Sequence, residues 1–219
     1  MSVCFEFTDN PKAPSFIIKD EFSTPVWIQQ EWTEGEFANY IVYNGCGHCC
    51  TAMVLNLLGV KIDPYEEYLH CRKMWGAPRQ GEPLFEENYM SAAGIEKIIE
   101  SFGIKAKAYG VEKGKTKAVA EHIMHELTCG KLVIFWSHPS DKLPDNPFSS
   151  GEHYVLLCGI TDDGKILVAN SSVRGKTDRG IQFADIETVE KALFEGSTIN
   201  DYTWGRHDLA GGGAYVVAG

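Results

Sequence analysis

An apolar stripe with helical spacing follows residue 46 and constrains the fold of this chain more than any other feature. Its members fall at positions i, i+3, i+4, i+7 and i+8, which is the buried face of a helix. They are Cys50, Met53, Val54, Leu57 and Leu58. Gly59 follows as a C-terminal stop, and one turn upstream the same face begins at Cys46. The sequence therefore predicts a buried helix that starts at a cysteine.

The remaining patterns place helices mainly before strands. Helical periodicity recurs at 91–102, 117–127 and 185–194, whereas 131–136, 153–158, 165–170 and 214–218 have the β-branched and aromatic composition of strands. Residues 1–45 look irregular, because Pro11, Pro14 and Pro25 interrupt any periodicity. Helices followed by strands predict an α+β fold, in a single domain over residues 1–219.

Charge and targeting signals exclude several classes of partner. Twenty basic and thirty acidic side chains give a net charge of −10, which argues against nucleic acid or an anionic membrane as partner. No signal peptide and no apolar run of about 20 residues is present, so we expect a cytoplasmic protein without a membrane segment. A leader lost from the sequence would instead make it a secreted one. Seven cysteines without scaffold spacing favour free thiols.

Cys46 is the first candidate for chemistry. A thiol attacks as its thiolate, so a catalytic cysteine needs surroundings that lower its pKa, such as a helix N-terminus and a neighbouring imidazole. Cys46 begins the predicted helix, where backbone N–H groups are available to an oxyanion. A cysteine in this position is more often a packed core thiol, so Cys46 needs a partner base to become a nucleophile candidate.

His153 is the candidate base, and Asn170 is its candidate partner. His153 begins one predicted strand, the turn signal 162–164 follows, and Asn170 ends the strand that pairs back. A hairpin of this kind brings the two side chains close together. In a Cys-His-Asn triad the asparagine orients the imidazole and fixes its tautomer. The loop at 137–151, which leads directly into His153, is expected to border the substrate cleft.

Three segments resemble the C39-like cysteine peptidases. Residues 45–59 (GCGHCCTAMVLNLLG) resemble their nucleophile helix, G-C-G-P-T-S-x-A-M-V-L-x-x-x-G. Residues 153–160 (HYVLLCGI) are similar to their strand H-[FY]-V-V-L-x-G-[VI], and residues 164–170 (GKILVAN) are similar to G-K-V-x-V-N-D. The likeness runs from about residue 26 to residue 170.

The resemblance implies a papain-like fold, with the nucleophile helix in an N-terminal helical part that packs on a C-terminal antiparallel sheet. It implies a peptidase that cleaves a peptide or related amide through a thioester acyl-enzyme, with Cys46 as nucleophile, His153 as base and Asn170 where relatives usually have Asp. No cofactor and no metal are expected. The identity of the substrate and the oligomeric state are not readable from the sequence.

Two departures from the family pattern affect the expected site. His48 replaces the usual proline, which adds an imidazole beside the nucleophile. The oxyanion glutamine that many relatives place six residues before the cysteine is missing, because Tyr40 stands there. Gln29 is the candidate counterpart across an insertion, and Gln30 competes with it.

Alternatives remain open at this point. The papain-style register C-G-[SA]-C-[WY] would make Cys49 the nucleophile, but the A-M-V-L match favours Cys46. Cys50 lies on the buried stripe and is therefore expected in the core. The same fold also supports an acyltransferase of the phytochelatin-synthase type, in which a thiol peptide replaces water. Less favoured are a metal site built from the cysteines and His48, a Cys46–Cys49 redox pair and a non-catalytic binding module.

Overall fold

The computed structural model describes residues 4–7, 16–19, 24–26, 45–75, 90–138, 142–172, 180–199 and 214–219. The helices in this part of the chain are α2 (Cys46–Leu57), α3 (Pro64–Trp75), α4 (Ala92–Ser101), α5 (Thr116–Thr128) and α6 (Ile186–Ala192). The strands are β1 (Cys4–Phe7), β2 (Phe16–Lys19), β3 (Thr24–Val26), β4 (Ala106–Tyr109), β5 (Leu132–Ser137), β6 (His153–Ile160), β7 (Ile166–Ala169), β8 (Ile181–Ala184) and β9 (Tyr215–Ala218).

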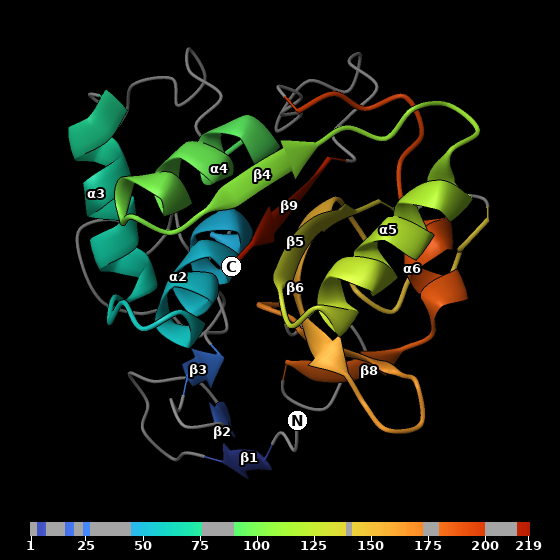
Figure 1. Ribbon diagram of the computed structural model, residues 1–219, viewed down its shortest axis with the longest axis horizontal. Helices are drawn as coiled ribbons and strands as arrows, with labels where there is room; N and C mark the ends of the chain where they lie inside the picture. Colours follow the sequence, from blue (N-terminus) through green and yellow to red (C-terminus); the bar gives the residue numbers. More distant parts are fainter. Residues whose placement is uncertain are drawn as a thin grey trace.

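A six-stranded sheet with the order β4-β9-β5-β6-β7-β8 forms the centre of the molecule, and every neighbouring pair in it is antiparallel. Helices α2, α3 and α4 lie on one side of these strands and α5 and α6 on the other (Figure 1). Because helices cover both faces, β5 is buried at every position, and its sequence is apolar from Leu132 to Trp136 rather than alternating. The expected α+β fold is confirmed.

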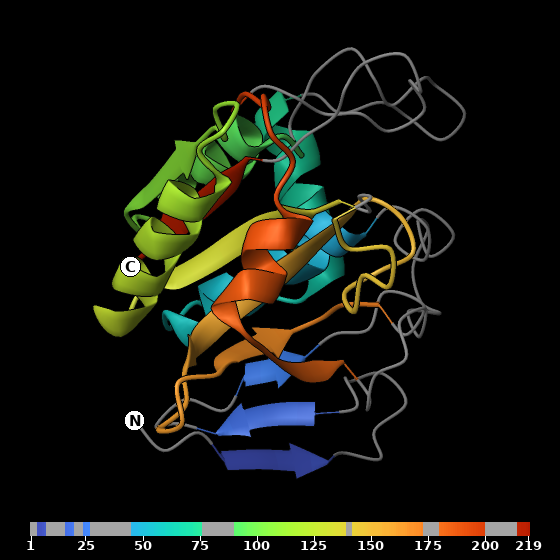
Figure 2. The same cartoon turned by 90° about the vertical axis from the view of Figure 1, so that its right-hand side faces the viewer.

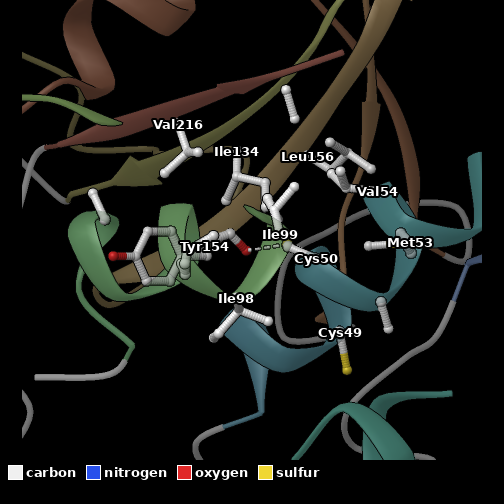
Figure 3. Packing of buried hydrophobic residues seen from close by; sticks show 14 of the residues in the cluster. Cys49, Cys50, Met53, Val54, Ile98, Ile99, Ile134, Tyr154, Leu156 and Val216 are labelled. Carbon is white, nitrogen blue, oxygen red and sulfur yellow. Dashed lines mark hydrogen bonds between the residues drawn. The ribbon is translucent and has the colours of Figure 1, made fainter. Parts of the chain in front are cut away.

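Two apolar clusters, one on each face of the sheet, hold these layers together. On β5, Ile134 packs in the cluster with α2 and α4, whereas Val133 and Phe135 pack in the cluster with α5 and α6. Figure 3 shows part of the first cluster, in which Cys50 lies beside Tyr154 of β6. The Cys50 thiol donates to the Tyr154 carbonyl oxygen at 3.5 Å. The α2 helix is therefore fixed against the strand that begins at His153.

Local signals decide where the helices begin and end. The stripe after Cys46 forms α2 as expected, and Gly59 adopts φ 92° beyond its end, a backbone conformation that favours glycine. Ser91 caps α4 by accepting from the Gly94 N–H at 3.2 Å. None of the described helices is long and apolar enough to cross a membrane.

The sequence-based prediction missed several elements. Residues 1–45 are not wholly irregular, because β1, β2 and β3 form a small antiparallel sheet (Figure 2). Pro25 is tolerated in β3 because β3 is an edge strand of this sheet. Helix α3 was also missed, although its start carries a signal. The Glu66 N–H donates to Asp63 Oδ1 and the Asp63 N–H donates to Glu66 Oε2, which forms a reciprocal capping box. Pro64, the first residue of α3, lies between the two and suits the first position of a helix.

Candidate active site

Cys46 is the first residue of α2, and the glycine beside it sets how closely β6 approaches. A Cβ atom on Gly47 would lie 2.7 Å from Met90 Sδ and 3.5 Å from a ring carbon of Tyr154. The Tyr154 hydroxyl donates to the Met90 carbonyl oxygen at 3.0 Å, so the two residues form one lid over this turn of the helix. A larger side chain at this position would therefore require the Met90 side chain to shift.

The half-buried Cys46 thiol lies among backbone N–H groups. Burial raises its pKa, and hydrogen bonds from the N–H groups of Tyr154, Gly47 and Cys46 itself only partly oppose that effect. The expectation of a lowered pKa is therefore wrong for the resting thiol, because loss of water outweighs the helix N-terminus. The contact with the Tyr154 N–H does bring the sulfur next to the residue that follows His153.

His153 and Asn170 lie together as the hairpin predicted. His153 begins β6, Asn170 directly follows β7, and the turn between the strands has Gly164 at φ 83°. His153 Nε2 is 2.9 Å from Asn170 Oδ1, and both side chains are buried. The proximity of the two side chains is confirmed, whereas their catalytic roles stay a prediction.

The partners of Asn170 determine which tautomer His153 adopts. Asn170 Oδ1 accepts from the Ser172 N–H at 2.9 Å, and Asn170 Nδ2 donates to the Phe148 carbonyl oxygen at 2.8 Å. A backbone N–H can only donate and a carbonyl can only accept, so the orientation of the amide is settled. The oxygen that faces His153 then requires a proton on Nε2, which leaves the Nδ1 lone pair as the basic position of the ring.

Burial also changes the acidity of His153. It lowers the pKa of the imidazole to about 4, and the hydrogen bond that His153 donates to Asn170 only partly opposes the change. Near neutral pH the ring is uncharged, and the Cys46 thiol is protonated. No hydrogen bond joins Cys46 Sγ to the His153 ring within the part of the chain that the structure describes. Such contacts are often loose before substrate binds.

Gln182, which the sequence analysis did not single out, supports this arrangement from β8. Its Oε1 accepts from Asn170 Nδ2 at 3.2 Å, and its Nε2 donates to the Pro147 carbonyl oxygen at 2.7 Å. Both Gln182 and the loop that ends at Phe148 therefore hold the asparagine. Strand alternation gives no hint of this, because the polar Gln182 is buried while the apolar Phe183 is exposed.

Some of the remaining candidate site residues lie in the core, and others lie outside the residues that the structure describes. Cys49 and Cys50 are completely buried. The His48 imidazole is also buried and contacts Glu67 of α3 through Nδ1. The oxyanion candidate Gln29 and its competitor Gln30 lie outside the described residues.

Comparison with known proteins relates this geometry to a family. The sequence model of the Peptidase_C39 like family matches residues 24–196, which is most of the chain. No curated protein matches. Among solved structures, the chain is similar to the peptidase domain of Streptococcus ComA, described as a bi-functional ABC transporter involved in a quorum sensing pathway. The identity is 11% and the TM-score 0.44, over 80% of this chain and 91% of that one. On the family match, the chain belongs to the Peptidase_C39 like family of cysteine peptidases.

Proposed function

We propose that this protein hydrolyses a peptide or related amide bond with Cys46 as nucleophile, His153 as general base and Asn170 as the residue that orients the base. The observation that carries the proposal is the amide orientation of Asn170. Its hydrogen bonds to Ser172 and Phe148 present Oδ1 to His153 Nε2 and so leave Nδ1 as the proton acceptor.

The charges of the resting groups support a general-base mechanism rather than a preformed ion pair. Burial raises the pKa of Cys46 and lowers that of His153, so both groups are neutral before reaction. As Cys46 Sγ attacks the substrate carbonyl carbon, its proton passes to His153 Nδ1. The imidazolium then gives this proton to the leaving amine, and the C–N bond breaks to leave a thioester. Water, deprotonated by the same nitrogen, hydrolyses the thioester and restores the thiol.

The oxyanion of the tetrahedral intermediate needs hydrogen-bond donors. The N-terminal turn of α2 supplies N–H groups without intrahelical partners, because the first such bond runs from the Cys49 N–H to the Gly45 carbonyl. We keep Gln29 as the side-chain donor in this proposal. Its test is Gln29→Ala, which should lower kcat by about 10²-fold or more.

The loop that precedes His153 forms one wall of the site in this proposal. Asn146 Nδ2 donates to Ser137 Oγ at 2.8 Å and Asn146 Oδ1 accepts from the Phe148 N–H at 2.9 Å, so the loop holds itself in one shape. Pro144 and Asp145 are exposed on it. Replacing both by glycine should change KM or the cleavage pattern with little effect on kcat; an unchanged substrate profile would reduce the loop to a connector.

A generic acyl donor tests the nucleophile without knowledge of the natural substrate. The protein is mixed with p-nitrophenyl acetate, nitrophenol release is followed, and the acetylated peptide is located by mass spectrometry. We expect the acetyl group on Cys46, and we expect turnover to be lost in Cys46→Ala and in His153→Gln. The control variant Cys129→Ala should retain turnover, because Cys129 is an exposed cysteine at the C-terminal end of α5. Acetylation confined to Cys129, or full turnover in Cys46→Ala, would refute the proposal.

Cleavage of a proteome-derived peptide mixture then separates hydrolysis from acyl transfer. Hydrolysis leaves free carboxyl termini, whereas transfer in the manner of phytochelatin synthase would give products extended by an added thiol peptide. We expect free termini that Cys46→Ala does not produce. Products that form only when a thiol peptide is added would make the protein an acyltransferase that uses the same residues.

A further inference from the structure

Three side chains with metal-binding chemistry meet between α2 and α3, away from the hydrogen bonds of His153. They are His48 of α2 and Glu67 and Cys71 of α3, and each offers one donor atom within 4.8 Å of the others. All three side chains are completely buried. Among the residues that the structure describes, they are the one group of three or more such side chains this close together.

The two helices present these donors to one another directly. Glu67 and Cys71 are four residues apart and therefore share a face of α3. His48 Nδ1 contacts Glu67 Oε2, and the Cys71 thiol donates to Glu67 Oε1 at 3.2 Å. Both oxygens of the carboxylate are thus engaged by groups that are metal ligands in their own right.

The charge of Glu67 is the physical reason to look for a cation. A completely buried carboxylate is costly unless a positive group compensates it. Among the described residues, no lysine or arginine forms an ion pair with Glu67; its ionic contact is with His48, which is charged only when protonated. A divalent ion would compensate a buried carboxylate and would be bound by all three donor atoms.

Cys49 is the next residue of α2 after His48 and is also completely buried. Figure 3 shows its sulfur pointing away from the labelled apolar side chains and toward the ribbon of α3. Its sulfur is not one of the three donor atoms that lie within 4.8 Å of one another, so binding through Cys49 requires its side chain to move.

We propose that His48, Glu67 and Cys71 bind a zinc ion between α2 and α3, with Cys49 as the fourth ligand. One nitrogen, one carboxylate oxygen and two thiolate sulfurs are all atoms that zinc binds in proteins, and four of them complete its tetrahedral coordination. The two thiols release their protons to solvent on binding. With Zn²⁺, three anionic ligands and a neutral imidazole, the site carries a charge of −1, which is the charge of a Cys₃His site.

The proposed ligands come in two pairs, one from each helix. Two come from adjacent positions on α2 and two from positions four apart on α3, so one ion would join two helices that already pack together. Its role would be structural, because Cys46 is not a ligand. The proposal is independent of the peptidase proposal, and either can fail alone.

Metal content tests the proposal without any substrate. The full chain is produced in zinc-supplemented medium, dialysed against a chelator that strips surface ions, and analysed by atomic emission. We expect about one equivalent of zinc per chain, a loss of at least tenfold in Cys71→Ser and Glu67→Gln, and weaker retention in Cys49→Ser. The matched control is Cys129→Ser, because exposed Cys129 lies 3.8 Å from His125 Nε2 and is an ordinary surface site.

Cobalt substitution keeps the proposal falsifiable if the variants do not fold. Wild-type protein refolded with Co²⁺ should show the visible bands of tetrahedral cobalt together with thiolate-to-cobalt charge transfer. Wild-type protein that holds no zinc and gives no such spectrum would overturn the proposal and leave the three residues as a hydrogen-bonded network. Zinc that disappears in Cys129→Ser would overturn it as well.

Discussion

Acidification should destabilise this protein through His153, and the variant His153→Gln should remove that sensitivity. The imidazole is buried against Asn170, and burial lowers its pKa to about 4. In the unfolded chain the same group has a pKa of about 6.5. Between these two values the unfolded state binds a proton that the folded state does not, so stability falls as the pH falls from about 6.5 toward 4.

The magnitude follows from the two pKa values. At about pH 7.5 both states are deprotonated at His153 and the residue contributes almost no pH dependence. At about pH 4.5 the unfolded state is almost fully protonated and the folded state only partly, which amounts to about 2.5 kcal/mol lost from the free energy of unfolding. That is a sizeable part of the roughly 5–15 kcal/mol that stabilises a typical domain.

Urea unfolding at several pH values measures the effect. Because the other titrating groups act equally in both proteins, the quantity of interest is the difference between wild type and His153→Gln. The glutamine amide keeps a donor for Asn170 but does not titrate. We expect the variant's deficit relative to wild type to shrink by about 2.5 kcal/mol from pH 7.5 to pH 4.5. The control is His125→Gln on the exposed face of α5.

A deficit that stays constant across this pH range would refute the reasoning, because the imidazole would then titrate alike in the folded and unfolded states. Activity gives a second reading of the same pKa. If His153 is the base, the acidic limb of kcat/KM for nitrophenyl acetate should lie near pH 4 and not near 6.5. A limb near 6.5 would mean that the ring is solvated in the active enzyme.

Three substitutions test the surroundings of the site. Asn170→Ala removes the partners of a buried backbone N–H and C=O and should lower the free energy of unfolding by about 2–5 kcal/mol, so an unchanged urea midpoint would contradict the amide assignment. Gly47→Ala brings a Cβ to 2.7 Å from Met90 Sδ and should cost about 1–3 kcal/mol in thermal unfolding; a variant as stable as wild type would mean that the lid yields freely. Gln182→Ala should lower kcat several-fold at constant KM, and a change confined to KM would argue against its support of Asn170.

Much of the candidate site could be predicted because it is local in the chain. The nucleophile helix is specified by its own apolar stripe and by the glycine that ends it. His153 and Asn170 meet because a single antiparallel hairpin joins them, and a tight turn at Gly164 determines its pairing over a short stretch of sequence. Periodicity and turn chemistry act over such distances, so they are visible in the sequence.

Tertiary structure decided the features that depend on segments far apart. Strand β9 lies between β4 and β5, Gln182 reaches Asn170 from β8, and His48 turns toward Glu67 on another helix. The pKa values of Cys46 and His153 were decided in the same way. A helix start and a neighbouring imidazole are sequence features that favour a thiolate. Burial between the packed layers removes water from both groups, and this loss of solvation has the larger effect on their pKa values. Desolvation depends on everything that surrounds a group in three dimensions, and no local pattern records it.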